Sequence, residues 1–273
     1  MKTVIVIPAR YGSSRLPGKP LLMLGGQTML ERVVNLSRVA ADGLPNVTIL
    51  VATEDDRIAE HCRQLGVDYM MTSDHHLTGT DRVAEVVKRL PEQPDFVLNM
   101  QGDAPLTPPQ CLRAMITTFQ KTGCDVITPV TQLTWQQLDS LRQTKSSTPF
   151  SGTTVTFNPM TGKAFWFSKT IIPAIRQETE QRKTQQKSPV FRHIGLYGYS
   201  SAVLEQYVHL PEGQFERLEG LEQLRFLENN YTIHCVVVEL NQHANMSGID
   251  SPEDVVRAEA LIAKQGELLT KVI

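Results

Sequence analysis

The chain has 273 residues, 41% of them hydrophobic, which is enough to bury the core of one large domain. Its formal net charge of −2 at pH 7 lacks the positive excess typical of general nucleic-acid binding, so an anionic ligand must be held by a local group of basic residues. From this charge we expect no nucleic-acid partner. No apolar run reaches the roughly 20 residues that a membrane-spanning helix needs, so we expect no membrane either.

The first half of the chain alternates predicted strands with predicted helices. Apolar, β-branched runs predict strands over 3–8, 47–52, 67–71, 96–100 and 126–129. Helical periodicity predicts helices over 28–41, 55–65, 81–90 and 108–122. This alternation predicts an α/β fold with a doubly wound, mainly parallel sheet. Ligands of such sheets bind at the carboxyl ends of the strands, here after Ile7, Ala52 and Met100.

The second half is less regular. A turn at 158–162 predicts a hairpin of strands 153–157 and 163–167, and further strands are expected over 190–199 and 233–239. The polar stretch 177–189 is expected to be an exposed loop or a frayed helix. Helices are predicted over 216–230 and 251–265, the second with Ser251 as N-cap, Pro252 at its first position and Asp254 at its third.

Cysteine usage indicates the compartment. Cys62, Cys111, Cys124 and Cys235 match no zinc-binding spacing, and three of them lie in or next to apolar patterns. They are typical of small buried hydrophobes in a reduced protein. The apolar start at 1–8 is too short for a secretory signal, so we expect a cytoplasmic protein.

The most informative segment is the loop after the first predicted strand. It carries three cations, two hydroxyls and two glycines: Arg10, Arg15, Lys19, Ser13, Ser14, Gly12 and Gly18. A nucleoside triphosphate needs such an array, because cations must offset about four negative charges while N–H and hydroxyl groups approach the oxygens. The pattern is neither a dinucleotide-binding glycine motif nor a Walker A loop. A solvated basic loop is the alternative, but it accounts less well for three cations in ten residues.

Two carboxylates are candidates for a divalent metal. Asp103 follows the strand predicted to end at Met100, and Asp250 precedes the N-cap of the last helix. Mg²⁺ prefers one or two carboxylates together with phosphate oxygens and water. For Asp250 alone, a turn or helix-cap role is the simpler interpretation.

One predicted strand in the second half has a polar face. His193, Gly195, Tyr197 and Tyr199 would share that face, because strand side chains alternate with a period of two. Gly195 would leave room for a ligand close to the backbone. A strand that packs its His and Tyr side chains into an ordinary core fits the pattern equally well.

The segment IPARYGSSRLPGKPL at 7–21 resembles the opening motif of the CMP-sugar synthetases, and within them it is most similar to the enzymes for 3-deoxy-manno-octulosonate (Kdo). Further matching segments follow in the family's order. They are VAT at 51–53, TGTDRVAEV at 78–86, NMQGDAP at 99–105, FSK at 167–169, RHIGLYGY at 192–199, LEQLR at 221–225 and GIDSPED at 248–254. Together they cover nearly the whole chain, which makes the resemblance specific.

The resemblance implies a fold, a reaction and partners. The fold would be a single nucleotidyltransferase domain of Rossmann type over 1–273, with a nucleotide-binding half at about 1–130 and a smaller sugar-binding and dimerisation part at about 131–250. The reaction would join CTP and Kdo to give CMP-Kdo and diphosphate, with Mg²⁺ as cofactor, for lipopolysaccharide or capsule synthesis. The resemblance also implies a homodimer.

The resemblance further implies roles for individual residues. Arg15, Lys19 and Asp103 would be catalytic, and Asp103 and Asp250 would hold Mg²⁺. The nucleotide contacts would be Arg10, Ser13, Arg15, Lys19, Thr80, Arg82 and Gln101, although a helix N-cap is an equally good interpretation of Thr80. The sugar contacts would be Lys169, His193, Tyr197, Tyr199, Glu222 and Gln223.

Some positions depart from the family pattern. Ala104 and Asp81 replace Glu, Lys169 replaces Arg, and the strand at 153–156 lacks a Lys. Because Arg and Lys are not interchangeable at a bidentate carboxylate site, a modified acid such as 8-amino-Kdo is the alternative to Kdo. A nucleotidyltransferase for hexose 1-phosphates would share the sheet and basic loop without needing the strand at 190–199. A non-catalytic relative would not need Lys19, Asp103 and Asp250.

Overall fold

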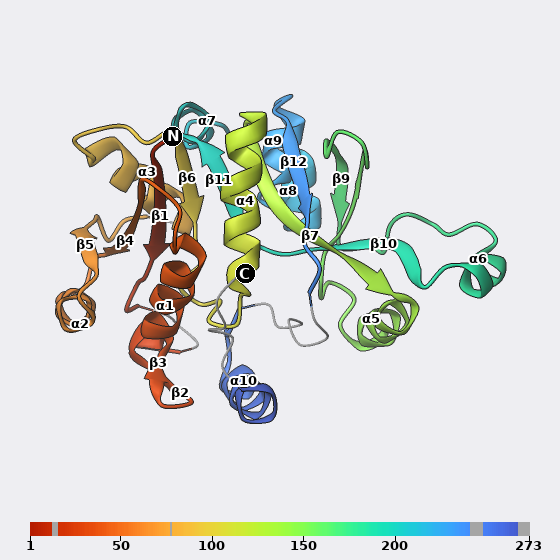
Figure 1. The fold of residues 1–273 in the computed structure, drawn as a ribbon, viewed down its shortest axis with the longest axis horizontal. Coiled ribbons are helices and arrows are strands. Elements are labelled where there is room, and N and C mark those ends of the chain that lie inside the picture. The colour runs from red at the N-terminus through yellow and green to blue at the C-terminus, as the bar shows by residue number, and fades with distance from the viewer. Residues whose placement is uncertain (13–15, 77, 241–247, 267–273) are drawn as a thin grey trace.

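The computed structural model describes residues 1–12, 16–76, 78–240 and 248–266 (Figure 1). Within these residues, ten strands form one sheet in the order β5-β4-β1-β6-β11-β7-β10-β8-β9, with β12 paired to β7. The strands are β1 (Thr3–Pro8), β4 (Val47–Thr53), β5 (Asp68–Met71), β6 (Phe96–Asn99), β7 (Val126–Thr134), β8 (Thr154–Phe157), β9 (Ala164–Ser168), β10 (Lys187–His193), β11 (Tyr197–Ser200) and β12 (Ile233–Val237). A short hairpin, β2 (Met23–Leu24) and β3 (Gln27–Thr28), is separate from this sheet.

The sheet combines a parallel half with a mixed half. Strand β1 lies between β4 and β6 and is parallel to both, with Thr3 opposite Val47 and Phe96. Strand β11 lies between β6 and β7 and is antiparallel to both, whereas β12 is parallel to β7. Strands β5, β4, β1, β6, β7, β8 and β12 therefore point one way, and β9, β10 and β11 point the other. The predicted α/β class with a mainly parallel sheet is confirmed.

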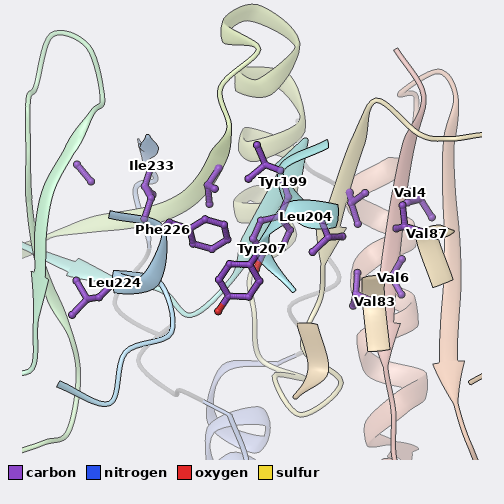
Figure 2. Packing of buried hydrophobic residues seen from close by; sticks show 14 of the residues in the cluster. Val4, Val6, Val83, Val87, Tyr199, Leu204, Tyr207, Leu224, Phe226 and Ile233 are labelled. Carbon is purple, nitrogen blue, oxygen red and sulfur yellow. The ribbon is translucent and has the colours of Figure 1, made fainter. Parts of the chain in front are cut away.

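Helices cover both faces of the sheet, as the prediction of a doubly wound fold requires. Alternate residues of β1 separate the two cores: Ile5 and Ile7 pack with α1 (Met29–Ala41), α2 (Asp56–Leu65) and α4 (Pro109–Thr122). Val4 and Val6 instead belong to the core formed with α3 (Gly79–Arg89), α7 (Ser201–Tyr207) and α9 (Leu224–Glu228), part of which Figure 2 shows. The remaining helical segments are η1 (Lys19–Leu21), α5 (Trp135–Ser147), α6 (Glu178–Thr184), α8 (Gln214–Glu219) and α10 (Pro252–Gln265).

The structure corrects the prediction of one continuous strand over 190–199. Strand β10 ends at His193 and β11 begins at Tyr197, and the two strands pair with different neighbours. Strand β10 lies between β7 and β8, whereas β11 is inserted between β6 and β7. The chain must therefore cross β7 after His193, and the alternating pattern of the sequence carried no signal for this crossing.

The predicted helix over 216–230 is also wrong, because the structure has two short helices there. Gly220 adopts a left-handed conformation, with φ of 62°, and ends α8. Such a residue commonly terminates a helix, since glycine adopts positive φ without steric cost. The prediction for the last helix is confirmed, with Ser251 and Asp254 forming a capping box around Pro252. None of the helices in the described ranges combines the length and apolar composition needed to cross a membrane.

Candidate active site

A cavity of about 210 Å³ opens at the carboxyl ends of β1 and β6. This is the edge of the sheet where the topology predicts a ligand. Its walls come from segments 8–10, 19–20, 78–79 and 101–103, together with His76, Arg82 and Asp250. Segments from both ends of the chain therefore meet in one polar hollow.

The side chain of Lys19 joins two carboxylates in this cavity. Its Nζ donates to Asp103 Oδ2 at 2.9 Å and to Asp250 Oδ1 at 3.1 Å. The lysine side chain is 12% exposed, whereas those of Asp103 and Asp250 are 38% and 49% exposed. A single cation thus lies between two partly solvated carboxylates. Their oxygens are the ligand type that Mg²⁺ prefers, in the number it normally takes from a protein.

Close backbone contacts fix the position of Asp103. A Cβ on the preceding Gly102 would lie 2.5 Å from the carbonyl oxygen of Pro8, so no other residue fits there without moving β1. The carbonyl oxygen of Asp103 accepts a hydrogen bond of 2.8 Å from the backbone N–H of Ile249. This bond brings the segment that carries Asp250 against the loop that carries Asp103.

Arg82 is buried beneath the cavity and pairs with another side chain of the protein. Its guanidinium forms an ion pair of 2.7 Å with Glu54, which follows β4. The other oxygen of Glu54 accepts the backbone N–H of Tyr11 at 3.0 Å. The pair therefore ties the start of the basic loop to β4 and α3. Glu54 was not predicted, although it follows Ala52, one of the strand ends where a ligand site was expected.

A chain of buried amides and hydroxyls leads away from the cavity. Gln101 Nε2 donates to Asn99 Oδ1 at 3.2 Å, and Asn99 Nδ2 donates to Thr80 Oγ1 at 3.4 Å. Asn99 and Thr80 also lie against the hydroxyl of Tyr199 in β11. Polar contacts thus connect the cavity with the second half of the chain.

Aromatic rings form a row beyond these contacts. The ring centroids of His193 and Tyr197 are 5.4 Å apart, and those of Tyr197 and Tyr199 are 6.3 Å apart. Phe226 continues the row at 5.7 Å from Tyr199, and Figure 2 shows these last two rings with Tyr207 in the core of this face. His193, Tyr197 and Tyr199 therefore lie on one side of the sheet although two strands supply them. Tyr199, 1% exposed, is also a core residue.

His193 is held as a neutral imidazole. The Thr128 hydroxyl donates to the carbonyl oxygen of Leu196 at 2.8 Å, and it lies 2.8 Å from His193 Nε2. A hydroxyl that donates to this carbonyl accepts the Nε2 proton of the histidine, an arrangement that leaves Nδ1 as an acceptor. Burial, with smaller contributions from the charges of Lys169 and Arg192, lowers the pKa of His193 to about 3. Burial likewise raises the pKa values of Tyr197 and Tyr199, so both hydroxyls stay protonated.

Two further predicted sugar contacts, Lys169 and Glu222, lie near this row, and a third, Gln223, is buried. Lys169 is half-buried, and burial lowers the pKa of its ammonium, which Glu219 partly offsets. The carboxylate of Glu222 is close enough to Tyr197 and Tyr199 that its charge contributes to their raised pKa values. Gln223 is 2% exposed, and its Nε2 donates to no acceptor among the described residues. A buried donor of this kind normally has a partner, and a bound ligand could supply one.

Residues 4–233 match the family model described as Cytidylyltransferase. The chain belongs to the cytidylyltransferase family. This cytidylyltransferase is 42% identical to the 3-deoxy-manno-octulosonate cytidylyltransferase of Maricaulis maris, over 98% of this chain and 100% of the relative. A protein of the same name from Acinetobacter baumannii is 38% identical over 93% of this chain and 95% of its own length. The family resemblance drawn from the motifs is confirmed.

A solved structure supports the same placement. CMP:2-keto-3-deoxy-manno-octonic acid synthetase complexed with CTP has a TM-score of 0.81 and 31% identity, covering 97% of this chain and 100% of that one. A cytidylyltransferase structure from Leptospira borgpetersenii, with a TM-score of 0.57 and 18% identity, shares the fold. The predicted nucleotidyltransferase fold is therefore confirmed.

The structure corrects one local interpretation and explains one departure of this cytidylyltransferase from the family pattern. Thr80 is not the N-cap of α3; that residue is Thr78. The Thr78 hydroxyl accepts the backbone N–H of Asp81 at 3.1 Å, and the Asp81 carboxylate accepts the backbone N–H of Thr78 at 3.1 Å. Asp81 therefore closes a capping box, a task that the family's Glu could also perform.

The predicted nucleotide contacts are only partly located. Arg10 is exposed at the cavity, and Lys19, Gln101 and Arg82 line it. Ser13 and Arg15 lie outside the described residues. The remaining residues that line the cavity are brought there by contacts between segments far apart in the sequence, and no local motif encodes such contacts.

Proposed function

We propose that this cytidylyltransferase transfers the cytidylyl group of CTP to Kdo and releases diphosphate. The observation that carries the proposal is the Lys19, Asp103 and Asp250 group, which lies in a cavity connected by polar contacts to a cluster of buried, neutral polar side chains. The names of the relatives, over nearly the full length of the chain, support both substrates.

In the proposed reaction the anomeric hydroxyl of the sugar attacks the α-phosphorus of CTP. A new P–O bond forms, the bond to the diphosphate breaks, and the hydroxyl proton is lost to solvent. Asp103 and Asp250 would hold Mg²⁺, which when bound neutralises charge on the triphosphate. The Lys19 ammonium contacts both carboxylates and can bind phosphate oxygens instead. Arg10, Ser13, Arg15 and Gln101 complete the proposed nucleotide contacts, while Arg82 and Thr80 support the pocket from within the protein.

On the sugar side the proposed roles follow from charge and protonation. Lys169 pairs with the sugar carboxylate, and the unpaired donor of Gln223 and the carboxylate of Glu222 bind hydroxyl groups. His193 accepts a hydroxyl proton at Nδ1 in a hydrogen bond. With a pKa of about 3 it is too weak a base to remove that proton, so it orients the sugar. Tyr197 and Tyr199 form the wall of the pocket.

We further propose a single domain with a nucleotide part at about 1–130 and a sugar part at about 131–250, supported by the continuous sheet. The protein would act as a homodimer, which light scattering can test. A cytoplasmic location is supported by the four cysteines, which are all free thiols.

The test is an assay of diphosphate release with CTP, UTP, ATP and GTP, with and without Mg²⁺, on Kdo and 8-amino-Kdo. We expect activity that needs Mg²⁺, prefers CTP and accepts Kdo. A preference for a purine nucleotide would contradict the proposal. Activity on 8-amino-Kdo alone would favour the modified acid, a second candidate that rests on Lys169 and Ala104 in place of the family's Arg and Glu.

A further inference from the structure

A second and larger cavity lies on the face of the sheet opposite the one that carries His193. It has a volume of about 720 Å³ and lies between α5, the loop at 148–152, the end of β7 and α10. It shares no lining residue with the nucleotide cavity. Arg192 lines it and His193 does not, as expected for consecutive strand residues that point to opposite faces. The cavity is therefore separate from the proposed sugar pocket, although one strand borders both.

Arg192 has no partner in the described part of the chain. Its guanidinium makes no hydrogen bond and no ion pair there, and it lies against Gly152, whose Cβ position would be 3.9 Å from Nε. Burial lowers the pKa of Arg192, and its charge in turn contributes to the lowered pKa values of Lys145 and His193. A partly desolvated guanidinium whose charge acts on a neighbouring lysine is unfavourable unless an anion joins it.

The other cation of the cavity is already neutralised. Arg257 forms an ion pair with Asp254, which also closes the capping box of α10. Arg192 is thus the cation that an incoming anion would find unpaired among the described lining residues. The five N–H donors of a guanidinium suit a carboxylate or phosphate, which two of them can bind together.

Three hydroxyl groups on or next to the helix that borders the cavity can serve as acceptors. The Ser140 hydroxyl donates to the carbonyl oxygen of Gln136 at 2.9 Å, and the Thr144 hydroxyl donates to that of Ser140 at 2.9 Å. The Thr148 hydroxyl likewise donates to the carbonyl oxygen of Thr144 at 3.0 Å. Because each of these hydroxyl protons has an acceptor within the protein, the oxygens can accept hydrogen bonds from hydroxyl groups of a ligand.

We propose that this cavity binds a small oxyanion that carries hydroxyl groups, such as a sugar acid or a polyol phosphate. Its carboxylate or phosphate pairs with Arg192, and its hydroxyls donate to Ser140, Thr144 and Thr148. The site is additional to the proposed active site and does not depend on the proposed function.

The test uses the full chain and thermal unfolding in an anion-poor buffer, with gluconate as the hydroxylated probe, inorganic phosphate as the plain anion and sorbitol as the uncharged control. Arg192→Met removes the charge and keeps the length, and Arg192→Gln is the second variant if Met does not fold. Arg257→Met is the matched control, since it changes a paired arginine of the same cavity.

Without added anion we expect Arg192→Met to unfold at the same or a higher temperature than the parent protein, because an unpaired buried charge is removed. Gluconate should raise the unfolding temperature of the parent and of Arg257→Met more than that of Arg192→Met. Calorimetry should show gluconate binding weakened about ten- to a hundred-fold in Arg192→Met, as for the loss of a charged hydrogen-bond partner.

Three kinds of result would overturn the proposal. A lower unfolding temperature of Arg192→Met without anion would mean that the guanidinium already has a protein partner. Equal responses of the parent and Arg192→Met to gluconate would contradict the role of Arg192. Equal binding of phosphate and gluconate would contradict a ligand that must carry hydroxyl groups. Light scattering provides the third: if Arg192→Met dissociates a dimer that the parent forms, the anion comes from a second copy of the chain.

Discussion

The two ends of the candidate site are built on opposite electrostatic principles. At the nucleotide end, charged groups face water: Asp103 and Asp250 are 38% and 49% exposed and share one ammonium. At the sugar end the polar groups are desolvated and mostly neutral, with His193 and Gln223 buried and the tyrosines protonated. The first end is suited to charges that arrive with the ligand, and the second to hydroxyl groups and one carboxylate.

This difference separates activity from stability. Exposed ion pairs contribute about 0–1 kcal/mol each, so changes at the nucleotide end should affect turnover with little change in the free energy of unfolding. Buried polar groups are costly to leave unpaired, so changes at the sugar end should affect both properties. Each of the following substitutions tests one side of that contrast.

The largest effect on turnover is expected for Asp103→Asn. The amide keeps the shape but not the charge, so kcat should fall roughly a hundred- to a thousand-fold while the free energy of unfolding stays within about 1 kcal/mol. Steady-state kinetics at saturating Mg²⁺ and urea unfolding measure the two quantities. Asp74→Asn, on an exposed aspartate outside the cavity, is the control. Near-normal turnover of Asp103→Asn would show that the nucleotide end does not depend on this charge.

Lys169→Ala should act on one substrate alone. Loss of a charged partner should raise the KM for the sugar about ten- to a hundred-fold and leave the KM for CTP within about twofold. Lys169→Arg should retain activity only if the pocket admits a planar group. Lys163→Ala, an exposed lysine of the same hairpin, is the control. An equal rise in both KM values would mean that the two ends are not separate in binding.

His193 should make stability depend on pH. Its pKa is about 3 in the folded protein, against a usual value near 6.5, so below pH 6.5 the unfolded chain takes up a proton that the folded chain does not. Stability should therefore fall as the pH is lowered from about 6.5 towards 3, by at most about 1.4 kcal/mol per pH unit from this group. Urea unfolding between pH 7 and pH 4 should give a shallower decline for His193→Gln than for the parent or for the exposed His75→Gln. Identical slopes would count against a buried neutral imidazole.

The smallest effect is expected at the N-terminus of α3, which borders the nucleotide cavity. Asp81→Ala opens the capping box and should reduce the free energy of unfolding by about 0.5–1 kcal/mol, with kcat changed less than about twofold. Asp81→Glu restores the box and should recover the stability. A large loss of turnover in Asp81→Ala alone would indicate that this acid contacts the substrate.

The regular half of the fold could be predicted because its signals are local. Apolar runs and helical periodicity located β1, β4, β6 and the helices between them within a few residues. The strand-end rule indicated the edge where Lys19, Asp103 and Asp250 meet. Asp103 and Asp250 are 84 and 231 positions from Lys19 in the sequence. The crossing of β7 between His193 and Tyr197 had no such signal, because strand order depends on which distant segments pair.

Local conformation also limited the prediction in the second half. The helix expected over 216–230 is interrupted because Gly220 takes a left-handed conformation, a freedom that helical periodicity does not reveal. Helix α5 was missed because few of its residues are apolar; only Trp135, Leu138 and Leu141 are buried among its described side chains. The ion pair of Arg82 with Glu54 joins two elements that no motif connects.

One lysine determines the shape of a loop that it does not belong to. The ammonium of Lys145, in α5, lies within hydrogen-bond distance of the carbonyl oxygens of Pro149, Ser151, Gly152 and Lys169. Its three N–H groups satisfy backbone groups that would otherwise need turns of their own. The carbonyl groups of the loop therefore help to specify its shape, together with the left-handed Gly152, whereas Phe150 within it is 74% exposed. During divergence the exposed Phe150 can be exchanged freely, while position 145 is constrained to a compact point charge that the planar fork of arginine does not replace.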